Sequence, residues 1–110
     1  MPAAYTNLYL EQGTTFTTTI TLDDVYGDIY DLSGYSASSQ IRKSYYSANA
    51  TATFSTSINI SQGTVTLDLA ADVTSNIAAG RYVYDTVLIS NNSTVRILEG
   101  IVDVSPRVTR

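Results

Sequence analysis

The chain has 110 residues, a formal net charge of −4, no cysteine and no histidine, and its length fits one domain held together by packing alone. Without histidine or cysteine there is no Ser-His or Cys-His pair for nucleophilic catalysis, and no glycine-rich phosphate loop precedes a helix, so we expect neither enzymatic activity nor a cofactor. The acidic balance disfavours nucleic acid, and no apolar run approaches the roughly 20 residues that span a bilayer, so neither is expected as a partner.

The composition favours strands over helices. Serine and threonine together make up 29 of the residues and tyrosine nine, whereas strong helix formers are scarce. The start of the chain, "MPAAYTNLYLEQG", lacks a basic stretch followed by an apolar run, so we expect no signal peptide. Turn signals divide the chain into about seven runs of strand character, a spacing typical of a β-sandwich.

The first two runs cover residues 6–11 and 14–22. The second run has a clean period of two, with mostly apolar residues on one face and only threonines on the other, which predicts a half-buried strand with a threonine ladder on its outer face. Its predicted inward residues are Phe16, Thr18, Ile20 and Leu22.

An acidic segment, "LDDVYGDIYDL", follows the second run. Calcium prefers several carboxylates in a flexible loop, and the weak candidates for such a site are Asp23, Asp24, Asp28 and Asp31. Aspartate and glycine also provide ordinary turn geometry, and we favour the turn.

Three further strands are predicted within residues 35–44, 50–60 and 64–69, because each alternates with a period of two. The polar hairpin "KSYYSANA" between the first two carries Tyr45 and Tyr46. Tyrosine provides a rigid surface with a polar tip, so this pair is a candidate protein interface or, with Tyr26, a platform for a sugar ring.

Residues 70–77 predict a short helical turn, with Asp72 as its cap. Gly80 then opens a strand that begins "RYVYD". In antibody-like sandwiches a tyrosine at this corner lies two residues before the cysteine that bridges the sheets. We therefore predict that Tyr82 forms the corner and that Tyr84 fills the space of the missing disulfide.

The strand that starts at Gly80 is apolar on both faces. Its second face carries Val83, Val87 and Ile89, with Asp85 among them. A sandwich strand with one wet face alternates more cleanly with polar residues, so we expect another segment or another subunit to cover this face.

The last strand changes phase, because Val95 and Ile97 have the opposite parity to Val102 and Val104. A bulge or sheet switch at Gly100 would absorb the shift.

The chain ends in an arm, residues 105–110, that contains Arg107 and Arg110. It is either a frayed tail or an arm that pairs with an acidic neighbour in an assembly.

Together these patterns predict one all-β domain over residues 1–110, an immunoglobulin-like β-sandwich of about seven strands without a disulfide. A jelly roll or a small barrel is the alternative.

Several ordered blocks carry a family resemblance. They are "QG-T" at 12–14, "DLSGY" at 31–35 leading to "QIR", "AGRYVYD" at 79–85, "EGIVDV" at 99–104 and a closing "VTR". In this order they resemble small immunoglobulin-like structural proteins of tailed bacteriophages and prophages, among them the N-terminal domain of the upper baseplate protein. The resemblance covers almost the whole chain.

The resemblance implies a non-enzymatic virion component that is assembled in the host cytoplasm in several copies. Its partners would be other virion proteins or copies of itself, in a tail, baseplate or fibre-docking position or, alternatively, as a capsid decoration protein. A carbohydrate-binding module that uses the exposed tyrosines on a host glycan is the alternative from another class. The interface candidates are Tyr45, Tyr46, Val83, Val87, Ile89, Arg107 and Arg110.

Overall fold

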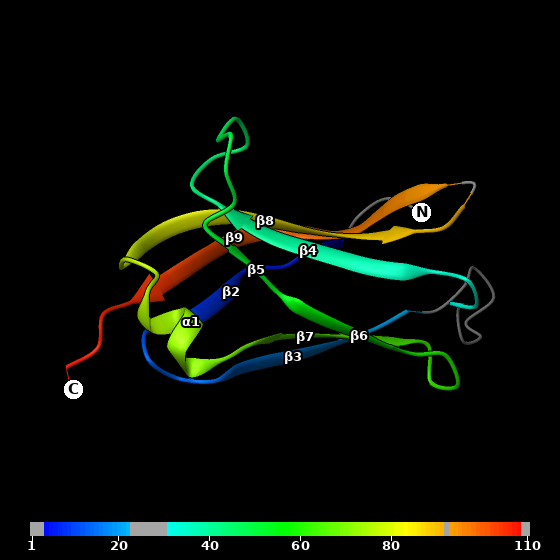
Figure 1. Cartoon of the computed structure of the whole chain (residues 1–110), viewed down its shortest axis with the longest axis horizontal. Coiled ribbons are helices and arrows are strands. Elements are labelled where there is room, and N and C mark those ends of the chain that lie inside the picture. Colours follow the sequence, from blue (N-terminus) through cyan, green and yellow to red (C-terminus); the bar gives the residue numbers. More distant parts are fainter. Residues whose placement is uncertain (1–3, 23–30, 92, 109–110) are drawn as a thin grey trace.

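The computed structural model describes residues 4–22, 31–91 and 93–108, which form two packed β-sheets (Figure 1). The larger sheet has the order β1-β9-β8-β4-β5, and β2 also pairs with β9; the smaller sheet has the order β3-β7-β6. The strands are β1 (Ala4–Tyr5), β2 (Leu8–Glu11), β3 (Phe16–Thr21), β4 (Ser36–Arg42), β5 (Ala52–Thr53), β6 (Ser55–Asn59), β7 (Thr64–Leu69), β8 (Gly80–Ile89) and β9 (Thr94–Ser105).

This arrangement is the immunoglobulin-like one that the sequence predicts. In that fold the second, fifth and fourth strands form one sheet, and the third, sixth and seventh form the other. Here β3, β7 and β6 form the first set, and β4, β8 and β9 form the second. The first strand pairs with β9 in parallel, not with β3. The predicted fold class is therefore confirmed.

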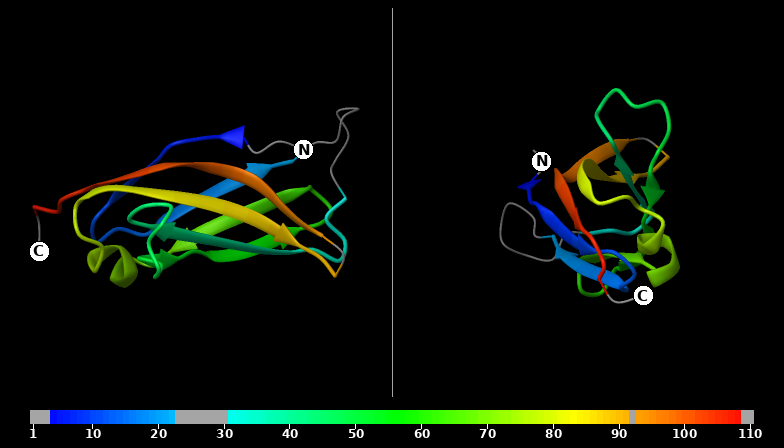
Figure 2. Two further views of the ribbon diagram at one scale, coloured as in Figure 1. Left: turned by 90° about the horizontal axis from the view of Figure 1, so that it is seen from above. Right: turned by 90° about the vertical axis from the view of Figure 1, so that its left-hand side faces the viewer.

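The core lies between the sheets and follows the predicted alternation. In β7 the inward side chains Val65, Leu67 and Leu69 are buried, and in β3 the threonines at odd positions are exposed. The larger sheet contributes Tyr82, Tyr84 and other buried residues to the same cluster. Seen end-on, the hairpin between β4 and β5 stands away from the two sheets (Figure 2, right).

The predicted strand over residues 50–60 is divided between the two sheets. β5 pairs with β4 in the larger sheet, and β6 pairs with β7 in the smaller one. Phe54 lies at the crossing, and its N–H donates to the carbonyl of Ser39 at 2.9 Å. Its ring lies 6.0 Å from that of Phe16 and 6.3 Å from that of Tyr84, measured between ring centroids. A chain of three aromatic rings therefore connects the sheets where antibody domains have a disulfide.

The corner before β8 has the expected geometry. Gly80 has φ of +146°, a conformation that other residues rarely adopt. The hydroxyl of Tyr82 donates to the carbonyl of Ala78 at 2.7 Å, which is the hydrogen bond of a tyrosine corner.

The preceding helix α1 (Ala71–Ser75) is capped by Ala70 without a side-chain hydrogen bond, so the prediction of Asp72 as cap is wrong. Asp72 lies in the first turn and accepts from the N–H of Val73.

The bulge predicted at Gly100 lies elsewhere. Gly100 pairs in register with Tyr84, and the register shifts where Thr86 opposes Leu98 and Val87 opposes Arg96. Ile97 is therefore the extra residue.

Gly100 is needed for another reason, because a Cβ at this position would overlap the carbonyl of Thr6. That carbonyl accepts a hydrogen bond of 2.6 Å from the Tyr84 hydroxyl. Thr6 lies between β1 and β2, which both pair with β9. In the part of the chain that the structure describes, no helix is long and apolar enough to cross a membrane.

Candidate interaction surface

The outer face of the larger sheet is the surface on which most of the predicted interface residues meet. Residues of β8 with odd numbers point away from the core, because Tyr82, Tyr84 and Leu88 point into it. Val83, Val87 and Ile89 therefore lie on one face along the central strand of this sheet. We call this surface, with the outward residues of the neighbouring strands, the outer face of the larger sheet.

Apolar and aromatic side chains from other strands extend this surface. Ile101 on β9 lies beside Val83 in the register. Tyr5 lies beside Glu99 and Tyr9 beside Asp103, and the two tyrosines are 62% and 70% exposed. The sequence reasoning did not single out Ile101 or either tyrosine. The signal was present, because Leu8 and Leu10 point inward and leave Tyr9 on the opposite face.

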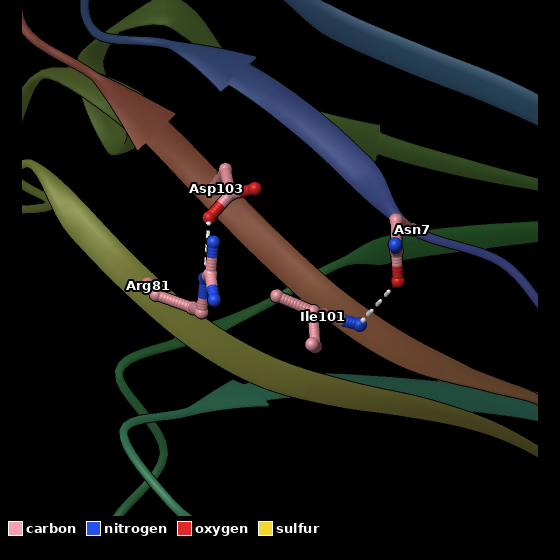
Figure 3. Close-up of polar contacts among 4 residues, drawn as sticks. All are labelled: Asn7, Arg81, Ile101 and Asp103. Atoms are coloured by element: carbon pink, nitrogen blue, oxygen red, sulfur yellow. Dashed lines mark hydrogen bonds and ion pairs between the residues drawn. The ribbon is translucent and has the colours of Figure 1, made fainter.

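Charged residues lie between the apolar ones. Arg81 Nε and Asp103 Oδ1 form an ion pair of 3.0 Å between β8 and β9, and the side chain of Asn7 accepts the Ile101 N–H nearby (Figure 3). The Arg81–Asp103 pair is largely exposed, so it contributes only about 0–1 kcal/mol to stability. This ion pair therefore contributes little to the stability of the fold.

Asp85 lies on this face and forms no ion pair with a described residue. It lies between Gln40 on β4 and Glu99 on β9, so two carboxylates are direct cross-strand neighbours. Glu99 forms an ion pair of 3.8 Å with Arg96, whereas Asp85 forms none within the described ranges, although Arg42 lines the same pocket. Like charges directly opposite each other are unfavourable.

The hairpin after β4 places Tyr45 at one end of the face. Arg42 fixes its base, because its guanidinium donates to the Ser47 carbonyl at 2.9 Å and to the Gln40 side chain at 2.8 Å. Tyr45 lines a small pocket of about 130 Å³ together with Gln40, Arg42, Val83 and Asp85. Tyr46 is 97% exposed. The two tyrosines therefore have different surroundings and do not share the pocket.

The described part of the C-terminal arm lies beside the turn between β2 and β3. Arg107 lies over Gly13, and its N–H donates to the Gln12 side chain at 3.2 Å. The other predicted residues of the arm and of the acidic segment, Asp23, Asp24, Tyr26, Asp28 and Arg110, fall outside the described residues. Asp31 accepts the Ser33 N–H at 3.0 Å, and this backbone hydrogen bond lowers the pKa of its carboxyl. No group of three or more acidic side chains that could hold a metal ion comes together in the described ranges.

The strand order and the tyrosine corner define the chain as an immunoglobulin-like β-sandwich. No protein-family model and no curated protein sequence matches it. Among solved structures, the crystal structure of InlP from Listeria monocytogenes has a similar fold, with a TM-score of 0.50 over 94% of this chain and 16% sequence identity. The chain spans 28% of the length of that structure. The similarity at this identity concerns the fold alone.

Proposed function

We propose that the chain is a non-enzymatic structural component of a tailed bacteriophage particle and works through protein–protein contacts. The resemblance of its ordered sequence blocks supports the phage assignment, with a tail, baseplate or fibre-docking position preferred over capsid decoration. The observation that carries the contact role is the apolar content of the outer face along β8, where Val83, Val87 and Ile89 lie on one line.

A comparison of the two outer faces supports this choice of surface. The outer face of the smaller sheet carries threonine and serine, and Thr19 and Thr66 share a hydrogen bond of 3.1 Å there. A face of this composition is typical of a solvent-exposed surface. The outer face of the larger sheet has aliphatic and tyrosine side chains among charged ones, a composition typical of interface cores and rims. We infer that this face meets a neighbouring protein in the particle.

The first test is quantitative mass spectrometry of purified particles from the phage or induced prophage that encodes the chain. Copies in multiples of three or six, up to a few tens, would support a tail or baseplate position, since such structures follow closed rotational symmetry. Hundreds of copies would favour capsid decoration. Absence from the particle would refute the proposal.

A matched pair of variants tests the surface itself. Val87→Asp places a charge on the central strand of the larger sheet, and Thr66→Asp places the same charge on the central strand of the smaller sheet; both side chains are half-buried. We expect both proteins to fold, as judged by circular dichroism, and only Val87→Asp to be missing from particles. Equal incorporation of both variants would show that the contact surface is elsewhere.

A second candidate function rests on the pocket beside Tyr45. An aromatic ring next to amide, guanidinium and carboxylate groups is an arrangement that can bind a sugar, since the ring stacks and the polar groups accept or donate hydrogen bonds. In a glycan array, saturable binding that Tyr45→Ala abolishes and Tyr46→Ala leaves intact would favour a carbohydrate-binding module. Loss of binding in neither variant would exclude this pocket as the sugar site.

A further inference from the structure

Among the described residues, nothing pairs with the outer edge of the smaller sheet at β3. β3 is the outermost strand of that sheet and runs along the lower margin of the molecule in Figure 1. In the described part of the chain no strand pairs with β3 on the side opposite β7. The preceding strand β2, which a tight turn joins to β3, belongs to the other sheet.

One contact shows which residues of β3 bond to β7 and which direct their main-chain groups toward the open edge. The Leu22 N–H donates to the Gly63 carbonyl at 2.9 Å, which continues the β3–β7 ladder. In an antiparallel pair, alternate residues bond to the partner strand, and those between them point their main-chain groups away. Thr17, Thr19 and Thr21 therefore direct their N–H and C=O groups outward.

β3 has none of the features that usually protect an open edge. Natural edge strands avoid pairing through charges, proline, bulges or short length. Residues Phe16–Thr21 contain no charge, proline or glycine, and their register with β7 is unbroken. The other edges differ. β5 has two residues, β1 and β2 are interrupted, and β6 lies against β4, where Thr56 donates its hydroxyl to the Ala37 carbonyl.

The apolar side chains of β3 are also incompletely covered. Phe16 and Ile20 point toward the core but remain half-buried, whereas their register partners Leu69 and Val65 on β7 are buried. The exposure therefore lies on the side of the open edge. A further strand along β3 would cover these two side chains and complete the sheet.

We propose that β3 pairs in antiparallel fashion with β3 of a second copy of this chain, around a two-fold axis through Thr19. In this register Thr19 meets its own counterpart, and Thr17 meets Thr21 of the other copy. All of these residues are odd-numbered, so each pair can exchange two main-chain hydrogen bonds. The same register brings Thr18 opposite Ile20, which joins the inward faces of the two copies.

The occupant is a second copy because the edge is complementary to itself. No charged residue of β3 faces its counterpart, although the chain as a whole carries a net charge of −4. A net negative charge opposes self-association through a surface that carries unpaired acidic groups. A two-fold axis also produces a closed contact, so the pairing ends at a dimer.

The experiment combines sedimentation equilibrium with residue-resolved amide exchange on the full chain. We expect a concentration-dependent dimer in which the amides of Thr17, Thr19 and Thr21 gain protection as the concentration rises. The amides of Thr18 and Ile20 should be protected at every concentration, because they bond to β7. A wild-type chain that stays monomeric up to about 1 mM would overturn the proposal.

A matched pair of lysine variants distinguishes the edge from the sheet surface. Thr19→Lys places a charge on the open edge, and Ser57→Lys places the same charge in the same cross-strand row, two strands away. We expect Thr19→Lys to lower the dimer association constant at least tenfold and Ser57→Lys to leave it unchanged. Thr21→Lys provides a second edge variant if Thr19→Lys fails to fold. A dimer that tolerates both edge variants would refute the β3 contact.

The pairing adds a self-contact to the proposed structural role but does not depend on it. If Val87→Asp is incorporated normally and the β3 dimer is still found, only the outer-face proposal fails. If the isolated chain is monomeric and a peptide containing β3 is protected only in purified particles, the edge belongs to a different chain. That result would overturn pairing with a second copy.

Discussion

Replacing Tyr84 with phenylalanine tests how the sandwich is stabilised without a disulfide. The ring would keep its edge-to-face contact with Phe54, whereas the hydroxyl that donates to the Thr6 carbonyl at 2.6 Å would be lost. A hydrogen bond of this kind contributes about 1 kcal/mol, and leaving the carbonyl without its partner adds to the loss, so we expect a decrease of about 1–2 kcal/mol in the free energy of unfolding at pH 7.

The same variant has an opposite effect at alkaline pH. Burial, with a smaller contribution from the charge of Tyr5, raises the pKa of Tyr84 to about 12. The unfolded chain releases this proton near its ordinary pKa of about 10, while the folded chain retains it. Tyr84 thus lowers stability as the pH rises from 10 to 12, by up to about 1.4 kcal/mol per pH unit. The phenylalanine variant lacks this loss, so we expect the two proteins to become equally stable near about pH 11.

Urea unfolding followed by far-ultraviolet circular dichroism measures both effects. At pH 7 the expected shift of the midpoint is about 1 M, given a slope of about 1–3 kcal/mol per M. Tyr46→Phe is the matched control at pH 7, because it removes a hydroxyl from an exposed ring and should not shift the midpoint. A stability difference between wild type and Tyr84→Phe that stays constant from pH 7 to pH 11 would refute the raised pKa. No difference at pH 7 would refute the role of the hydrogen bond.

Three further substitutions test the contacts around the core by the same urea assay. Gly100→Ala should destabilise by about 1–3 kcal/mol, because its Cβ would overlap the Thr6 carbonyl; an unchanged midpoint would show that the first strand can move aside. Tyr82→Phe should cost about 1 kcal/mol through loss of the bond to Ala78, and a smaller effect would mean that the corner contributes little. Gln12→Ala should lower the free energy of unfolding by about 1–2 kcal/mol, because the Gln12 side chain bonds both to the Arg107 amide and to the Ile77 carbonyl. The variant should also exchange the Arg107 amide hydrogen faster. Slow exchange of that amide would contradict the role of Gln12 in holding the arm.

The fold was predictable because most strands have one wet and one buried face. Period-two alternation identifies the inward residues of β3, β4 and β7 without knowledge of the partner strands. The corner was predictable because glycine followed by "RYVY" combines a special backbone conformation with two tyrosines on one face. The hydrogen bond from Tyr82 to Ala78 agrees with that expectation.

The sheet change at Phe54 was not predictable from alternation. Ala52, Phe54 and Thr56 keep the same inward parity across the crossing, because both sheets face one core. The pattern therefore identifies a face and does not identify a sheet. Only the pairing partners, β4 before the crossing and β7 after it, distinguish β5 from β6.

The prediction of a bulge at Gly100 is wrong because the side-chain pattern, and not the glycine, marks the irregular position. Ile97 and Leu98 are consecutive and both buried, which marks the place where one residue is added to the strand. Gly100 is conspicuous in the sequence for its missing side chain. What requires it, the carbonyl of Thr6, is distant along the chain and leaves no local signal.

The sequence identified only a part of the candidate surface, because the rest of it also depends on contacts between distant parts of the chain. Val83, Val87 and Ile89 stood out because they are apolar on a strand whose other face is also apolar. Tyr5 and Tyr9 join them only because the first strand pairs in parallel with β9. That long-range pairing places them beside Glu99 and Asp103. The inward Leu8 and Leu10 indicate that Tyr9 faces outward, but the local sequence does not indicate which strand lies beside it.

The aromatic connection between the sheets links stability to the open edge of β3. Phe16 is the member of the Phe16–Phe54–Tyr84 chain that remains half-buried, and it lies on the strand proposed to pair with a second copy. Aromatic pairs of this kind contribute about 0.5–1.5 kcal/mol beyond their buried area, less than the roughly 2–4 kcal/mol of a disulfide. Pairing along β3 would bury Phe16 further and strengthen this connection.

Because association of folded chains stabilises the folded state, the melting temperature of the wild type should rise with protein concentration. That of Thr19→Lys should not, and Ser57→Lys should behave as wild type. A melting temperature that is independent of concentration in all three proteins would show that the aromatic connection does not depend on assembly. Phe16 would then be half-buried simply because it lies on an edge strand.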